Sequence, residues 1–137
     1  MAVSSTVAPR PVEAGSRAQQ AYQAMHVIFT IAPIIAGVDK FTDLLGNWDQ
    51  YLAPVIAHML PFSAHTFMMV VGVIEIVAGI GVFFLPRIFA YVVSAWLLGI
   101  IFNLLLGGQY LDVALRDLGL SVGAFSLGRM SEEFSDR

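Results

Sequence analysis

Cysteine is absent from the 137-residue sequence, which excludes disulfide bonds, thiolate metal sites, iron–sulfur clusters and cysteine nucleophiles. Charged residues make up only 12% of the chain, against about 25% in a typical soluble domain. The net charge of −3 is too small to indicate a nucleic-acid partner. A chain with so few charges cannot cover a water-facing surface with polar groups, so we expect lipid to be its solvent.

Sequence motifs for independent chemistry are also missing. The chain contains no Ser–His–Asp arrangement, phosphate-binding loop or HExxH zinc motif. His26 and His65 are predicted at opposite ends of the membrane and His58 in a loop, so they do not predict a pair of haem ligands. A metal site of His58, His65 and Asp49 is less favoured than polar anchoring at the interface. We therefore predict no catalytic residue, no metal site and no resident cofactor.

Long apolar stretches are what the sequence does contain. Hydrophobic residues make up 58% of the chain, and the mean hydropathy is +0.78. The stretch from Thr66 to Leu85 is long enough to cross a bilayer, which takes about 20 apolar residues. We predict an all-α integral membrane protein that forms a four-helix bundle. Its spans are expected at residues 21–38, 66–85, 88–106 and 111–128.

The remaining segments are predicted to lie outside the membrane core. Residues 1–20 are expected to form a flexible tail and residues 131–137 a second, polar tail. The connection between the first two spans should hold a short interfacial helix from Trp48 to Leu60, because Trp48 and Tyr51 are aromatics typical of that level. With four spans, five arginines lie on the same side of the membrane as both tails, and two basic residues lie on the other side. Because cytoplasmic segments carry the excess of Lys and Arg, this distribution predicts cytoplasmic termini.

Each predicted span has one stripe of small or polar residues at helical spacing. The stripes are His26, Thr30, Pro33, Gly37 and Lys40; Gly72, Glu75 and Gly79; Ala95, Gly99, Asn103 and Gly107; and Asp112, Arg116, Gly119, Gly123 and Ser126. Small residues let helix backbones approach each other in lipid, and polar residues turn inward. We therefore expect all four stripes to face the bundle axis and the large apolar residues to face lipid.

Glu75 is the ionisable residue in the middle of the second span. A carboxylate at that depth costs on the order of 2.5–3.5 kcal/mol on insertion scales, so a partner is expected. Lys40 and Arg116 have side chains long enough to reach it. The predicted buried polar layer consists of Lys40, Glu75, Asn103, Arg116 and Asp117, with Asp39 and Asp112 at its rim.

The buried polar layer has three interpretations. Opposite charges inside a bundle hold helices in register, which is the favoured interpretation. The second is a pocket for a polar head group, such as a quinone ring or a bound lipid. The third is a proton path through Glu75, but the inner half of the bundle offers only His26 and Thr30 as relay groups.

The chain also resembles the DoxX-like small membrane proteins. Three segments carry the resemblance: Gly37-Val38-Asp39-Lys40; Glu75-x-x-x-Gly79-x-Gly81 followed by Pro86-Arg87; and the stretch from Leu111 to Leu120 with its Ala114-Leu115-Arg116-Asp117. The apolar run Ile80 to Phe84 and the polar N-terminal tail depart from the family pattern. Because the resemblance pairs the first two segments, Lys40 is the first-choice partner of Glu75.

The resemblance implies a bacterial or archaeal cell membrane and a redox setting. The family is similar to the membrane subunit of thiosulfate:quinone oxidoreductase, and other members are membrane partners of redox enzymes. We expect an accessory or structural subunit, without activity of its own, in a membrane-bound redox or photosynthetic complex. Its partners would be the bilayer and larger membrane subunits. The alternatives are a quinone-reactive subunit of a thiosulfate:quinone oxidoreductase-type enzyme, and a small carrier.

Overall fold

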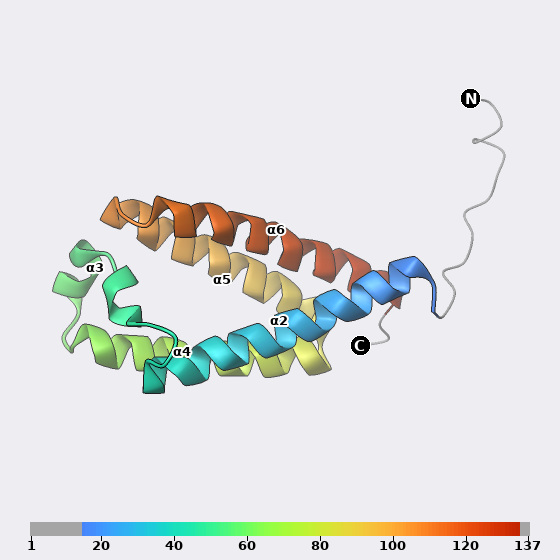
Figure 1. Ribbon diagram of the computed structural model, residues 1–137, viewed down its shortest axis with the longest axis horizontal. Coiled ribbons are helices and arrows are strands. Elements are labelled where there is room, and N and C mark those ends of the chain that lie inside the picture. Colours follow the sequence, from blue (N-terminus) through green and yellow to red (C-terminus); the bar gives the residue numbers. More distant parts are fainter. Residues whose placement is uncertain (1–14, 135–137) are drawn as a thin grey trace, which may run out of the picture.

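The computed structural model describes residues 15–134, and every regular element within that range is helical (Figure 1). The elements are α2 (Arg17–Thr42), η1 (Trp48–Tyr51), α3 (Pro54–Met59), α4 (Ala64–Phe84), α5 (Pro86–Gly107) and α6 (Leu111–Phe134). The predicted all-α class is therefore confirmed. Most of the predicted N-terminal tail and the last three residues of the C-terminal tail lie outside the described residues.

The outermost helices are longer than predicted. Ser16 caps α2 by accepting a hydrogen bond from the Gln19 amide, so residues 17–20, expected in the tail, are already helical. At the other end, α2 continues to Thr42 and stops where Asp43 adopts a left-handed conformation (φ 54°). The last helix also passes the predicted end at residue 128. Ser131, expected in the polar tail, is buried within α6.

The connection between α2 and α4 contains two short helices where one was predicted. The 3₁₀ helix η1 ends at Tyr51, and α3 begins only at Pro54. A proline disfavours the helical conformation in the residue before it, and Ala53 is accordingly extended (ψ 135°). The proline that starts α3 thus separates it from η1.

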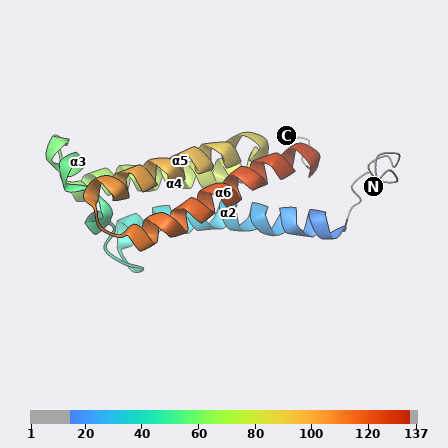
Figure 2. The ribbon, with the colours of Figure 1, turned by 90° about the horizontal axis from the view of Figure 1, so that it is seen from above.

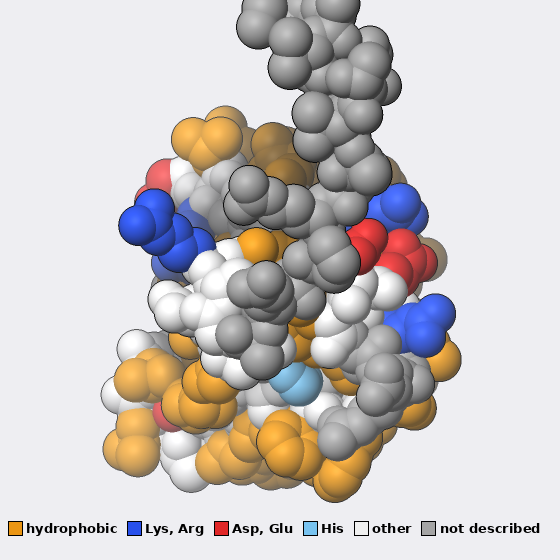
Figure 3. All heavy atoms as spheres, turned by 90° about the vertical axis from the view of Figure 1, so that its right-hand side faces the viewer, with side chains coloured by type: hydrophobic (Ala, Val, Ile, Leu, Met, Phe, Trp, Pro, Cys, Tyr) orange, Lys and Arg blue, Asp and Glu red, His pale blue; other side chains and the backbone are white. Residues whose placement is uncertain are grey.

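The long helices form two closely packed antiparallel pairs, α2 with α4 and α5 with α6 (Figures 1 and 2). We call the end with the Leu85 turn between α4 and α5 the inner end. The opposite end, which holds η1 and α3, is the outer end. Basic and acidic side chains lie around the margin of the inner end (Figure 3).

Small residues let α2 and α4 come into backbone contact, as their stripes predicted. A Cβ atom added to Gly72 would lie 2.6 Å from the Gly37 carbonyl oxygen, and one added to Gly79 would lie 2.7 Å from the Thr30 carbonyl oxygen. His26 belongs to the same stripe, and its Nε2 lies 2.8 Å from the Val82 carbonyl oxygen. Both stripes therefore face each other along the length of the pair.

The α5–α6 pair does not use the predicted stripes. Its polar contact is reciprocal: Ser94 Oγ donates to the Ser121 carbonyl oxygen (2.9 Å), and Ser121 Oγ donates to that of Ser94 (3.0 Å). Gly99 and Gly119 have open space where a Cβ would stand. Both glycines are exposed, so they point away from the interface that holds the Ser94–Ser121 contact. The expected inward orientation of these glycines was wrong.

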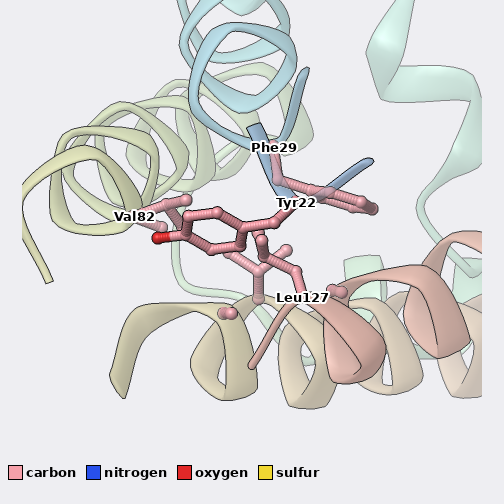
Figure 4. Packing of buried hydrophobic residues seen from close by; sticks show 8 residues of the cluster. Tyr22, Phe29, Val82 and Leu127 are labelled. Carbon is pink, nitrogen blue, oxygen red and sulfur yellow. The ribbon is translucent and has the colours of Figure 1, made fainter. Parts of the chain in front are cut away.

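Two hydrophobic cores lie one behind the other along the bundle. The inner core takes residues from all four long helices, and Figure 4 shows Tyr22, Phe29, Val82 and Leu127 meeting there. The outer core is smaller. It consists of Leu52, Met68 and Val71, with Trp48 and Trp96 among the side chains packed against it.

Three of the long helices, α2, α4 and α5, are long and apolar enough to cross a membrane. Large hydrophobic side chains are widely exposed on them, for example Val73 and Val77 at 51% and 56%. These features indicate a membrane location. Among the described helices α6 is not one of these, because Asp112, Arg116 and Asp117 lie within its first two turns and make it more polar. The structure thus has three such helices where the sequence predicted four spans.

Candidate functional site

The Lys40–Glu75 ion pair lies between the two cores. Lys40 Nζ is 2.5 Å from Glu75 Oε1, and the two side chains are 5% and 11% exposed. Lys40 is in the last turn of α2, and Glu75 lies between Val71 of the outer core and Ala78 of the inner core. The close α2–α4 packing brings the two residues together. The predicted pairing of Glu75 with Lys40 is confirmed.

Trp48 of η1 covers the other side of the lysine. The Lys40 ammonium nitrogen lies 3.9 Å from the centroid of the Trp48 ring, well within the range of a cation–π interaction. The indole nitrogen of Trp48 donates a 2.7 Å hydrogen bond to Asp39 Oδ2. The ammonium group is therefore held between a carboxylate and an aromatic face, and the aromatic ring is itself held in place.

Asp39 organises the loop that follows α2. Its carboxylate accepts hydrogen bonds from the backbone amides of Leu44 (2.9 Å) and Leu45 (3.0 and 3.1 Å), and from Thr42 Oγ1 (3.0 Å). The sequence placed Asp39 only at the rim of the layer. One sequence signal could have identified this role: an aspartate just before the predicted end of a helix that is followed by a loop. In that position a carboxylate often accepts hydrogen bonds from nearby backbone amides.

We expect Asp39→Ala to loosen this loop and release Trp48 from Lys40. The Leu44 and Leu45 amides would lose their acceptor, so their hydrogen exchange should accelerate by about tenfold, the size of one lost hydrogen bond. Asp39→Asn keeps one acceptor oxygen and should show a smaller effect. Asp112→Ala, which removes an exposed acidic residue at the start of α6, is the control. Unchanged exchange in Asp39→Ala would contradict this role.

Arg116 and Asn103 do not join the predicted layer. The Arg116 side chain is 69% exposed, and its ion-pair contact is with the neighbouring Asp117 (Nε–Oδ1 3.9 Å), not with Glu75. Asn103 instead binds the backbone of the segment between α2 and α4. Its Nδ2 donates to the Tyr51 carbonyl oxygen (2.7 Å), and its Oδ1 accepts from the Ala53 amide (2.9 Å). Because Arg116 and Asp117 are adjacent on a helix, they point to different sides, and only Asp117 is buried.

Asp117 and Trp96 complete the surroundings of the pair. Asp117 is 7% exposed and lies within electrostatic range of Glu75, so α6 contributes a second buried carboxylate, as predicted. Trp96 of α5 also approaches Glu75. Its buried Nε1 faces the Glu75 carboxylate, outside strict hydrogen-bond geometry, and has no other acceptor among the described residues. All four long helices thus contribute to the region around the Lys40–Glu75 pair.

The histidines at the outer end do not gather into a metal site. His65 Nδ1 lies 3.4 Å from Asp49 Oδ2, which links the first turn of α4 to η1. No set of three or more His, Asp or Glu residues within residues 15–134 is arranged to hold a metal ion.

Comparisons with models of known protein families, with characterised proteins and with solved structures found no match. The geometry of the site is therefore the main guide to function. It consists of a buried ion pair covered by a tryptophan and two hydrophobic cores. Such an arrangement links α2 to α4, and any reaction with an outside molecule requires that one of the covers move.

Proposed function

We propose that this chain is a four-span membrane protein that acts as an accessory or structural subunit of a larger membrane-bound redox complex. The observation that carries the proposal is the closed state of the Lys40–Glu75 pair. The Lys40 ammonium group is enclosed by the Glu75 carboxylate and the Trp48 ring. Both charges of the pair are therefore neutralised by partners within the chain. A buried pair of this kind is best suited to fixing helix register. The redox setting rests on the resemblance to DoxX-like proteins.

A fourth span is supported by the outward surface of α6. Its first 15 residues expose large apolar side chains, which suit contact with lipid or with another membrane subunit. These side chains are Leu111, Leu115, Leu118, Leu120, Val122 and Phe125. Because α6 packs along the full α5 helix, it would cross the same hydrocarbon layer. With four spans both termini lie on one side, and the distribution of arginines favours the cytoplasm.

The proposal is tested by purification from the native membrane. A chain with a C-terminal affinity tag should co-purify with larger membrane subunits after solubilisation in a mild detergent, in a fixed ratio measured by native mass spectrometry. A second preparation in a harsher detergent should release the chain alone and serves as the control. Recovery of a stable, active, uncomplexed chain from the mild detergent would overturn the accessory role.

A quinone-reactive subunit is the second candidate function. The observation that favours it is the buried Nε1 of Trp96, which faces the Glu75 carboxylate and has no other acceptor among the described residues. A quinone carbonyl oxygen that took the place of the carboxylate would accept the hydrogen bond of the same N–H group. The same purification distinguishes the two: a chain that reduces quinone with thiosulfate when isolated has this second function.

A further inference from the structure

The Lys40–Glu75 pair is closed off very differently on its two sides. We propose that residues 48–53, which we call the outer plug, form a gate that opens and connects the pair to the aqueous phase at the outer end. The plug comprises η1 and the two residues after it. The proposal concerns access within the chain itself and does not depend on which partner complex or substrate the protein has.

The inner side of the pair is closed by the helices themselves. Glu75 is nine residues from the end of α4 at Phe84, or about 13 Å of helix. The inner core fills that length with side chains from all four long helices, including Phe29, Val82 and Leu127 (Figure 4). Because these residues belong to continuous helices, water cannot reach the pair from this side unless the helices separate.

The outer side is closed by a short segment attached through side chains. The plug is attached to both helix pairs. Asp49 contacts His65 of α4, in the first pair, and Asn103 of α5, in the second pair, donates a hydrogen bond to the Tyr51 carbonyl oxygen. The Tyr51 ring packs edge-on against Tyr110, just before α6, with centroids 4.7 Å apart. Each of these contacts can break without disturbing a membrane-spanning helix.

The apolar contact of the plug is confined to three residues. Leu52 and Ala53 are buried, Leu52 meets Met68 and Val71 of α4 in the outer core, and Trp48 packs against the same core. A segment that has few buried apolar contacts and is held mainly by side chains opens locally. The free energy of that opening is well below that of global unfolding. When the plug lifts, Trp48 leaves the Lys40 ammonium group, and Met68 becomes accessible together with the pair.

The absence of cysteine allows a direct test with single-cysteine variants in sealed proteoliposomes. Met68 of the outer core and Ala78 of the inner core are both 8% exposed and both belong to α4, so they form a matched pair. We expect Met68→Cys to react with a membrane-impermeant thiol reagent added at the outer side, and Ala78→Cys to remain unmodified. Equal reaction rates at the two positions would overturn the proposal.

A second substitution tests whether the plug is the barrier. Asn103→Ala removes the two hydrogen bonds that hold Tyr51 and Ala53, and should accelerate modification of Met68→Cys by about tenfold or more. The same substitution combined with Ala78→Cys controls for general unfolding and should leave that position protected. An unchanged rate at Met68→Cys, or acceleration at both positions, would show that the plug does not open as a gate.

Discussion

Replacing Lys40 with methionine should destabilise the folded protein by about 3–5 kcal/mol, because it leaves the buried Glu75 carboxylate without its cation. The side chain that remains is only 11% exposed, so water cannot substitute for the lost ammonium group. The substitution also removes the charge that faces the Trp48 ring. The measurement is the free energy of unfolding in mixed detergent micelles, with helix content followed by circular dichroism.

Two further variants show whether the effect belongs to the pair. The double variant Lys40→Met, Glu75→Gln removes both charges and should recover most of the lost stability. Arg116→Met is the matched control, since it removes the other cation that the sequence offered to Glu75. Its side chain is 69% exposed, so we expect a change within about 0.5 kcal/mol. A large loss in Arg116→Met, or none in Lys40→Met, would contradict the observed pairing.

The choice between these two cations shows which part of the site the sequence could predict. Spacing along α2 and α4 places Lys40 and Glu75 on facing stripes of small residues, and an uncompensated carboxylate in a membrane span requires a partner. That reasoning identified the pair correctly. For α6 the sequence could not decide which of two adjacent charged residues turns inward. The rotation of that helix places Ser121 against Ser94, on a face that no distinctive sequence pattern marks.

The connection between the first two spans was the least predictable part of the site. Its aromatic residues indicated an interfacial segment, but not that Trp48 turns back onto Lys40. That contact depends on the Asp39 carboxylate, which binds both the loop backbone and the Trp48 indole. Such contacts are set by three-dimensional loop closure. Helical periodicity, which predicted the stripes of α2 and α4, gives no information about them.

The close approach of α2 and α4 leads to the second large expected effect. Gly37→Ala should destabilise the protein by about 1–3 kcal/mol, the usual cost of overpacking a tight interface. The added Cβ would overlap the Gly72 carbonyl oxygen and crowd the Ile76 side chain at 2.7 Å. A carbonyl oxygen in a helix cannot swing aside as a flexible side chain can, so the two helices must move apart.

Moving the helices apart should also weaken the ion pair, because Lys40 lies one turn beyond Gly37 on the same face of α2. We therefore expect Gly37→Ala to lower the coupling free energy between Lys40 and Glu75, measured by repeating the double-mutant cycle in this background. Gly99→Ala is the matched control. It has nothing within 4 Å of the added Cβ, so improved helix propensity should leave stability unchanged or raise it by up to about 1 kcal/mol. If Gly37→Ala were as stable as Gly99→Ala with the same coupling, the backbone contact would not be what positions the pair.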